Sequence, residues 1–301
     1  MYDLIVIGGG PAGLTATVYA IRKRLNVLLL SKDLGGKTNF HLSLPWIEDY
    51  QVIKGLEVVN KFRTELEYLD FARHIEAVEQ VEKKDQHFVV TTKGGAMLEA
   101  KAVIVATGTR QVRMEVPGEK EYTMKGVCYS ALSYAPLFID KSVVIIGDQE
   151  LALRSAGELS TVASQVTLVC ANDKLLDSPL GAKLKQAGNV KIMKGCEIVE
   201  VQGDEYARKL VVKDSAGKLN VIETDGIFVE KALTAATGMV SDLVKLDEQG
   251  RIIVDCACRT NVPGLFAAGD VTNGYAEQVL IAVGDGAKAA LSAYEYLLPL
   301  L

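Results

Sequence analysis

Two segments of this chain share one pattern, an unbroken apolar run that leads into a glycine-containing turn and then a helical periodicity. In the first, the run at residues 4–7 precedes a helix predicted over residues 14–24. In the second, the run at residues 142–146 precedes a helix predicted over residues 151–162. Continuous runs rich in β-branched residues are typical of strands buried on both faces of a parallel sheet. The pattern therefore predicts two parallel sheets.

Each segment continues with a second apolar strand, at residues 27–30 and 166–169, so each opens a βαβ unit. Residues 254–270 then have the pattern of strand, turn and strand, and a long helix is predicted over residues 276–298. This late segment must complete one of the two sheets. We therefore predict an α/β protein with two Rossmann-like, three-layer dinucleotide-binding domains, the second inserted in the first.

The predicted crossings between the domains lie near residues 114–118 and 244–250. The first domain is accordingly expected to contain residues 1–115 and 246–301, and the second to contain residues 116–245.

The composition argues against a nucleic-acid-binding protein, a membrane protein and a metalloprotein. The chain has 301 residues and a net charge of −5, with no basic face of the kind that binds nucleic acid. No apolar run approaches the ~20 residues that span a bilayer, and the chain starts directly with a strand, so we expect a cytoplasmic protein without a membrane partner. Five cysteines form no secreted-type framework, and the three histidines lie far in sequence from the Cys256-Ala-Cys258 pair, so no metal site is predicted.

The first turn, Gly8-Gly-Gly-Pro-Ala-Gly13, matches the dinucleotide-binding fingerprint between a strand and a helix. Gly8 permits the tight turn, Gly10 lets the backbone approach a pyrophosphate, and Gly13 lets helix and strand pack closely. The N–H groups at the start of the helix that follows attract the phosphates. The acidic residue usually found at the end of the next strand is missing, so the ribose contact is expected from Ser31 or Lys32.

Two later motifs favour FAD over a nicotinamide alone. Ala106-Thr-Gly108 ends one apolar strand, and Gly264-Leu-Phe-Ala-Ala-Gly-Asp270 ends another. The second is followed by Ala276-Glu-Gln278 and by a helix that contains Gly284-Asp-Gly286.

These motifs, with Gly35-Gly-Lys37, Ile47-Glu-Asp-Tyr50 and Arg259-Thr-Asn-Val-Pro-Gly264, resemble the low-molecular-weight thioredoxin reductases of the pyridine nucleotide-disulfide oxidoreductase family. The resemblance covers essentially the whole chain. It implies a homodimeric FAD enzyme in which Gly8, Gly10 and Gly13 hold the pyrophosphate. Asp270 is expected to meet the ribityl or phosphate region, and Gln278 the pyrimidine side of the flavin. The complete expected FAD set is Gly8, Gly10, Pro11, Ala12, Gly13, Ser31, Gly36, Lys37, Asp49, Ala106, Thr107, Gly108, Gly269, Asp270, Glu277, Gln278 and Val279.

Two of these positions depart in charge from the family pattern. Relatives usually have Gly-Gly-Gln and Glu-Asn-Tyr-Pro where this chain has Lys37 and Asp49. A cation beside the flavin would stabilise its reduced, anionic form, and an anion could cancel that effect. The alternative is that both side chains point to solvent.

The redox-active Cys-x-x-Cys of thioredoxin reductase is absent, because Ser130 and Ser133 occupy its two positions. The only close cysteine pair in the sequence is Cys256-Ala-Cys258. If these residues lie in a strand, both side chains face one side, and they form a candidate catalytic redox pair. The alternative is two small, half-buried packing residues.

The second glycine turn is altered. It reads Gly147-Asp-Gln-Glu-Leu-Ala152, with Gln149 at the middle glycine position and Asp148 and Glu150 where a phosphate would dock. The paired arginines that NADPH-dependent relatives carry after the next strand are missing, and so is the family's Gly-x-x-Pro-x-Thr segment. We therefore expect no ordinary NADPH binding, and a second FAD in or beside this domain is an open possibility.

The resemblance includes atypical, NADPH-independent members that accept electrons from ferredoxin. We accordingly expect a protein donor such as ferredoxin, with thioredoxin or another dithiol protein as a possible acceptor. A basic cluster at residues 22–24 is one candidate docking site, and the alternative is that it only caps a helix. Tyr129 and Tyr134 either stack on the flavin or pack between the domains. Two alternative functions remain open, a ferredoxin–NADP⁺ reductase of the thioredoxin-reductase type and a non-catalytic flavin-binding scaffold or sensor.

Overall fold

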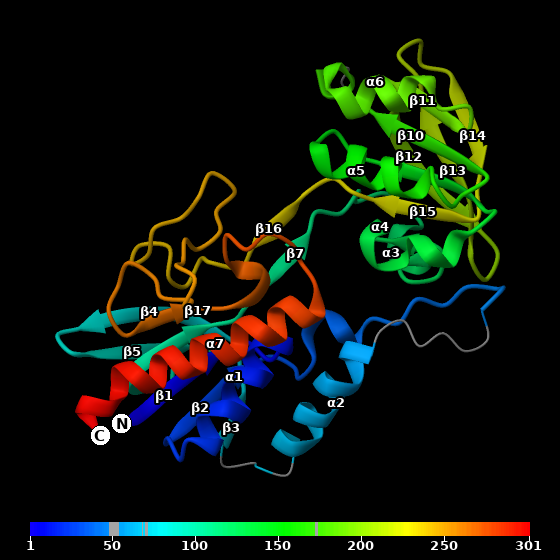
Figure 1. Ribbon diagram of the computed structural model, residues 1–301. Coiled ribbons are helices and arrows are strands. Elements are labelled where there is room, and N and C mark those ends of the chain that lie inside the picture. The colour runs from blue at the N-terminus through cyan, green and yellow to red at the C-terminus, as the bar shows by residue number, and fades with distance from the viewer. Residues whose placement is uncertain (48–53, 68, 70–71, 172–173) are drawn as a thin grey trace. The chain divides into compact units, whose positions relative to one another are not determined.

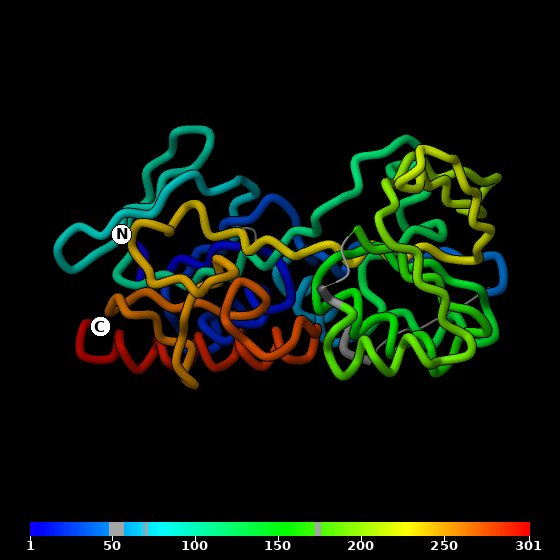
Figure 2. The backbone as a smooth tube through the Cα atoms, turned by 90° about the horizontal axis from the view of Figure 1, so that it is seen from above, coloured from blue at the N-terminus to red at the C-terminus, as the bar shows by residue number. Residues whose placement is uncertain are grey.

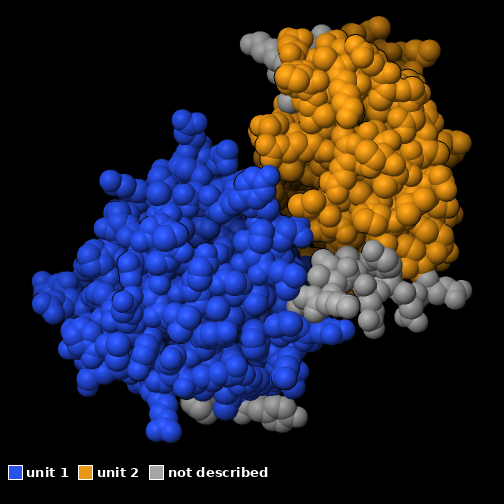
Figure 3. Space-filling view, in the orientation of Figure 1, with its two compact units in different colours: residues 1–39, 53–110, 234–301 blue, residues 40–52, 111–233 orange. Residues whose placement is uncertain are grey.

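The computed structural model describes residues 1–47, 54–67, 69, 72–171 and 174–301. The chain divides into two compact units, which Figure 3 shows in different colours. Unit 1 contains residues 1–39, 53–110 and 234–301, and unit 2 contains residues 40–52 and 111–233. The second unit is thus inserted in the first, and the predicted fold class is confirmed.

The main sheet of unit 1 has the order β3-β2-β1-β6-β5-β4, and β17 also pairs with β6. The four pairings β1–β2, β1–β6, β2–β3 and β6–β17 are parallel, whereas β4–β5 and β5–β6 are antiparallel. The strands are β1 (Tyr2–Ile7), β2 (Val27–Ser31), β3 (Arg73–Ile75), β4 (Val78–Lys84), β5 (His87–Thr92), β6 (Met97–Val105) and β17 (Leu265–Ala267).

Both faces of this sheet are buried, as the continuous apolar runs predict. Leu4 and Val6 of β1 belong to a core formed with helices α1 (Pro11–Arg22) and α7 (Val279–Leu297). Ile5 and Ile7 face a second core formed with β4, β5 and the returning chain around Val240. Helix α2 (Lys54–Glu67) lies beside α1 on the helical face (Figure 1).

Helices α1 and α7 approach each other closely because small residues meet at their contact. A Cβ on Gly286 would lie 2.1 Å from the carbonyl oxygen of Ala12, so only glycine fits there. The two chain ends lie at one end of unit 1 (Figures 1 and 2), where Lys101 Nζ contacts both Asp3 Oδ1 and the carbonyl of Leu300. Short 3₁₀ helices are η1 (Gly36–Asn39), η5 (Gly269–Val271) and η6 (Leu298–Leu300).

Unit 2 repeats this plan with a parallel sheet of order β11-β10-β9-β15-β8. A three-stranded antiparallel sheet, β12-β13-β14, covers one face. The strands are β8 (Val127–Cys128), β9 (Ser142–Ile146), β10 (Gln165–Cys170), β11 (Val190–Lys194), β12 (Glu197–Gly203), β13 (Ala207–Lys213), β14 (Leu219–Glu223) and β15 (Gly226–Val229).

The other face of this sheet carries helices, so that Val143 and Ile145 pack against them while Val144 and Ile146 face the antiparallel sheet. The helices of unit 2 are α3 (Glu119–Tyr122), α4 (Ala131–Tyr134), η3 (Ala135–Phe138), α5 (Glu150–Leu159), η4 (Lys174–Asp177) and α6 (Pro179–Gln186). In both units the chain leaves the first strand in one direction and returns on its other side, the strand order of a dinucleotide-binding sheet.

The boundaries of the units differ from those predicted. The first crossing lies at residues 110–111 and the second at residues 233–234, where β7 (Thr109–Gln111) pairs with β16 (Leu233–Ala235). Residues 234–245 belong to unit 1 because Val240 and Val244 are buried in its core. Residues 40–47 belong to unit 2, where Trp46 Nε1 donates to the carbonyl of Leu137.

The predicted strand–turn–strand at residues 254–270 is only partly correct. Residues 255–258 form a turn, isolated bridges occur at Ile252 and Arg259, and β17 is the one full strand in this described stretch. In the part of the chain that the structure describes, no helix is long and apolar enough to cross a membrane.

Candidate functional site

The first glycine turn connects β1 to α1 at the carboxyl edge of the unit 1 sheet. Gly8 has a φ of 113°, and a Cβ on it would lie 2.3 Å from the carbonyl oxygen of Ala106. A Cβ on Gly13 would lie 1.7 Å from the carbonyl oxygen of Gly8. These two positions accept only glycine, because the turn folds back against the end of β6 and against itself.

Gly10 differs from both neighbours, since no heavy atom lies within 4 Å of where its Cβ would be. Its φ of −72° is one that any residue adopts, so the fold itself does not require glycine at this position. Gly10 caps α1, Pro11 begins the helix, and the first turn carries no acidic side chain. This open, positive helix end fits a pyrophosphate that contacts the backbone.

The segment after β2 borders the same turn. Gly36 has a φ of 57°, and its Cβ would lie 3.1 Å from the Cα of Gly10. Ser31 is buried, and its hydroxyl donates to the carbonyl of Asp33 at 2.6 Å. Asp33, which the sequence analysis did not select, accepts from the Gly36 amide at 2.9 Å. Ser31 and Asp33 therefore both organise the loop that follows β2.

Ala106, Thr107 and Gly108 form the turn that ends β6. The Ala106 amide donates to Ile7 of β1, and Thr107 Oγ1 donates to the carbonyl of Ala236. Gly108 has a φ of 65°, and nothing lies within 4 Å of its Cβ position. The turn is thus fixed by the returning chain and leaves open space over Gly108.

The C-terminal motif reaches the same edge of the sheet. The Ala268 amide donates to Val105, and Gly269 has a φ of 75°, with a Cβ on it lying 3.0 Å from Ala12 Cβ. Asp270 follows in η5, and Val279 begins α7. Gln278 caps that helix without a side-chain bond to it, and its Nε2 donates to the carbonyl of Glu277.

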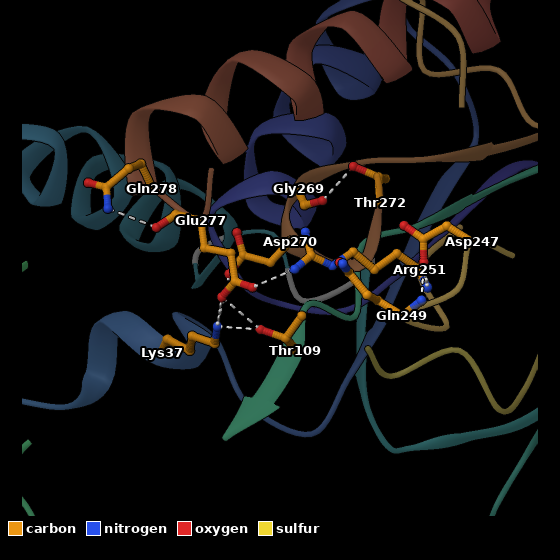
Figure 4. Close-up of polar contacts among 10 residues, drawn as sticks. All are labelled: Lys37, Thr109, Asp247, Gln249, Arg251, Gly269, Asp270, Thr272, Glu277 and Gln278. Carbon is orange, nitrogen blue, oxygen red and sulfur yellow. Dashed lines mark hydrogen bonds and ion pairs between the residues drawn. The ribbon is translucent and has the colours of Figure 1, made fainter. Parts of the chain in front are cut away.

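Lys37 is at the centre of a polar cluster that joins four segments of unit 1 (Figure 4). Its Nζ lies 3.0 Å from Asp270 Oδ2, 3.0 Å from Glu277 Oε2 and 2.5 Å from Thr109 Oγ1. Thr109 Oγ1 in turn donates to Glu277 Oε2 at 3.1 Å. Of the two expectations for Lys37, the structure excludes the one in which it points to solvent. Asp49 lies outside the described residues.

The carboxylates dominate the electrostatics of this cluster. Burial lowers the pKa of Lys37, but the charges and hydrogen bonds of Asp270 and Glu277 outweigh it, and the pKa is raised. Arg251 NH2 lies 3.9 Å from the second carboxylate oxygen, Glu277 Oε1. That oxygen is buried and has no hydrogen-bond partner among the described residues, which is costly unless a ligand supplies a donor. Neither Thr109 nor Arg251 was selected from the sequence.

These observations fit FAD. Backbone at Gly10 and Gly108 is open where a bound group would approach, and the helix end of α1 is free of acidic side chains. Glu277 Oε1 offers an acceptor 3.9 Å from Arg251 NH2. When bound, FAD supplies one-electron and two-electron redox chemistry.

The second glycine turn has a different geometry. Gly147 keeps the tight contact, because its Cβ would lie 2.2 Å from the carbonyl oxygen of Glu230. Asp148 Oδ1 accepts from the Ala171 amide and so bridges the ends of β9 and β10. Gln149 caps α5, and Glu150 in the first turn pairs with Arg154 at 2.8 Å. Acidic side chains thus surround a helix end that a phosphate would otherwise bind.

Ser130 and Ser133 form a hydrogen-bonded turn in unit 2. Ser130 Oγ lies 3.0 Å from Ser133 Oγ and accepts from the Ser133 amide, capping α4. The buried Glu230 accepts from the Ala131 amide at 2.7 Å, so a carboxylate that follows the end of β15 holds the same helix end.

Tyr129, Tyr134 and Cys128 pack in the cores of unit 2. Tyr129 is buried, donates to Glu119 Oε1 at 2.8 Å, and burial with this carboxylate raises its pKa to about 12. Tyr134 packs against the core that contains Cys128, and burial raises its pKa to about 12. Cys128 is fully buried, as expected for a packing residue.

The expected strand geometry of Cys256 and Cys258 is wrong. The two residues lie in the turn at residues 255–258, Cys258 has a φ of 63°, and both thiols are free. Cys256 is exposed, whereas Cys258 is buried and its Sγ contacts the carbonyl of Asp285 at 3.6 Å. Burial raises the pKa of Cys258 to about 11, so this thiol is a poor nucleophile at neutral pH.

The basic cluster at residues 22–24 lies at the C-terminal end of α1, whereas Gly10 lies at its N-terminal end. Twelve helical residues separate these ends, a rise of about 18 Å. Arg22 pairs with Glu65 at 3.2 Å, and Lys23 lies over the ring of Tyr294. Two of the three cations of this cluster therefore already contact other side chains of unit 1.

The chain belongs to the pyridine nucleotide-disulphide oxidoreductase family, whose model matches residues 2–286. Its structure is similar to thioredoxin reductase from Streptococcus pyogenes MGAS5005, with a TM-score of 0.89 and 33% identity over 99% of this chain and 98% of that one. Thioredoxin reductase from Giardia duodenalis gives a TM-score of 0.87 at 27% identity, over 98% of each chain. The chain is therefore a member of this family with a thioredoxin reductase-like fold.

Curated relatives point to the same family. An alkyl hydroperoxide reductase component of Staphylococcus aureus (strain MSSA476) is 35% identical over 304 residues, which cover 99% of this chain and 59% of that protein. The corresponding component of Staphylococcus epidermidis is 34% identical with the same coverage. The chain thus spans less than two thirds of the length of these relatives.

Proposed function

We propose that this protein is an FAD oxidoreductase that works without NADPH and without a Cys-x-x-Cys disulfide, and that a protein donor such as ferredoxin reduces it. The observation that carries the proposal is the contrast between the two glycine turns. In unit 1 the helix end is open and free of acidic groups, whereas in unit 2 Asp148 is bonded across the strand ends.

The electrostatics of the second turn support the loss of NADPH. The pyrophosphate of a nucleotide would meet Asp148 and Glu150 at the start of α5, and like charges at close range disfavour binding. The side chain of Gln149 stands where relatives present bare backbone.

The residues at the positions of the family's disulfide support the proposal that the protein works without a Cys-x-x-Cys pair. Ser130 and Ser133 hydrogen-bond to each other, and hydroxyls do not exchange electrons with thiols. Cys258 is buried in a turn with a raised pKa, so Cys256 and Cys258 offer a weak substitute for the lost pair. An acceptor with its own dithiol, such as thioredoxin, would then have to react at another site.

The test is an anaerobic reduction series on the purified protein, with FAD per chain determined first. NADPH, NADH and reduced ferredoxin are added separately while the flavin absorbance is followed, and an NADPH-dependent thioredoxin reductase is measured in parallel. We expect reduction by ferredoxin within seconds and no reduction by either nucleotide. Fast reduction by NADPH at micromolar concentration would overturn the proposal and favour a ferredoxin–NADP⁺ reductase.

Two further outcomes are informative. If no donor reduces the flavin and no dithiol protein oxidises it, the protein is a flavin-binding scaffold or sensor. An FAD content near two per chain would place a second flavin in the altered unit. Homodimerisation, which the family resemblance suggests, is checked by sedimentation of the same sample.

A further inference from the structure

The cluster around Lys37 is balanced in charge. Lys37 and Arg251 contribute two positive charges, and Asp270 and Glu277 contribute two negative ones. The Asp270 and Glu277 side chains are 17% and 18% exposed, so their charges are only partly screened by water. Removal of any one member therefore leaves a net charge at this place.

The cluster lies among the segments that the family resemblance assigns to FAD. Thr109 directly follows the Ala106–Gly108 turn, Asp270 follows Gly269, and Glu277 precedes Gln278. Lys37 binds all three segments through its ammonium group. A net charge in this cluster therefore acts on a group bound in the open space over Gly108, the residue before Thr109.

From this geometry we infer that the Lys37–Glu277 pair sets the affinity of the site for reduced relative to oxidised FAD. This inference rests on the proposed FAD chemistry. Reduced FAD carries more negative charge than oxidised FAD, so a net positive site favours the reduced form and a net negative site disfavours it. In the intact cluster the opposite charges of Lys37 and Glu277 offset each other, so the pair holds the affinity ratio at an intermediate value from which loss of either partner shifts it.

A pair that served only to hold the two segments together would give a different result in the two single variants. If the pair only held η1 against the segment that precedes α7, loss of either partner would weaken the site in the same way. A charge-setting role predicts that Lys37→Gln and Glu277→Gln act in opposite directions on the relative affinity, and that the double variant restores it.

The experiment measures the reduction potential of bound FAD by equilibration with a reference dye and dithionite, which does not depend on the natural donor. We expect Lys37→Gln to lower the reduced-to-oxidised affinity ratio about tenfold, a shift of about 30 mV for a two-electron couple. Glu277→Gln should raise the ratio by a similar factor. Lys37→Arg and the double variant should stay within about threefold of wild type.

Lys101→Gln is the matched control. Lys101 holds a comparable pair, 2.9 Å from Asp3 Oδ1, in the same unit but at the amino end of β1. It should leave the ratio unchanged. A second readout is urea unfolding of the FAD-free variants, in which coupling between Lys37→Gln and Glu277→Gln shows that the pair forms without cofactor.

The outcomes separate the two hypotheses. Equal shifts in one direction from both single variants, or no shift from either, would overturn the inference while FAD chemistry stands. A wild-type protein that binds no FAD would instead refute the proposed function. Normal shifts together with rapid NADPH reduction would refute the proposed donor and leave the inference intact.

Discussion

Gly10→Ala offers a clean separation of fold from cofactor binding. The φ of Gly10 is −72°, and its Cβ position has no heavy atom within 4 Å. Alanine is a poorer helix cap than glycine by up to about 1 kcal/mol, but the loss of chain entropy in the unfolded state offsets about 0.4–1 kcal/mol. The FAD-free variant should therefore unfold within about 2 °C of wild type.

The effect on FAD should be much larger. The added methyl group stands where the pyrophosphate must approach the backbone, and overpacking of this kind costs about 2 kcal/mol. That corresponds to roughly 30-fold weaker binding. The fold and the affinity thus respond to the same substitution by very different amounts.

The assay is titration of FAD-free protein with FAD, followed by flavin fluorescence, beside thermal unfolding of the same samples. Gly13→Ala is the contrasting variant, because its Cβ would lie 1.7 Å from the carbonyl oxygen of Gly8. It should lose stability as well as affinity. Wild-type FAD affinity in Gly10→Ala would refute the assignment of this turn to the pyrophosphate.

Three further substitutions test other parts of the structure. Gly284→Ala, in α7 with no atom within 4 Å of its Cβ position, should stabilise the protein by about 0.5–1 kcal/mol in urea unfolding. Glu230→Ala leaves the Ala131 amide without its buried acceptor and should destabilise unit 2 by about 2 kcal/mol, with Glu230→Gln losing less. Burial raises the pKa of Asp3, but hydrogen bonds from Lys101 and the backbone outweigh burial, and the pKa is lowered. The stabilisation from the charged carboxylate is therefore present above pH 3.8, the ordinary pKa of aspartate, and is lost as the pH falls through the lowered pKa. The stability gap between wild type and Asp3→Asn should therefore close in acid.

For each of these three predictions, one experimental result would contradict the reasoning. A Gly284→Ala protein less stable than wild type would mean that this face of α7 is covered. Equal losses from Glu230→Ala and Glu230→Gln would show that side-chain volume matters more than the bond. For Asp3, a gap that persists at acid pH would exclude the charged pair as its cause, and Lys101→Gln provides the matching measurement at neutral pH.

The fold was accessible from local signals. The apolar runs and glycine turns predicted β1, β9 and the helices that follow them to within a few residues, because strand burial and turn geometry depend on neighbours in sequence. The unit boundaries were less accessible. Residues 234–245 join unit 1 through contacts of Val240 and Val244 with strands far away in the chain, which no local pattern encodes.

The features of the candidate site also fall into two groups, those that the sequence determined and those that only the tertiary structure decided. The sequence by itself determined which residues form the first glycine turn and that the second turn is acidic. Only the tertiary structure decided that Cys256 and Cys258 lie in a turn, and that Asp148 bonds across the strand ends. It also decided the role of Lys37, whose carboxylate partners lie 233 and 240 residues away. The physical reason is that a charge's effect depends on its nearest partners in space, and folding alone brings those partners together.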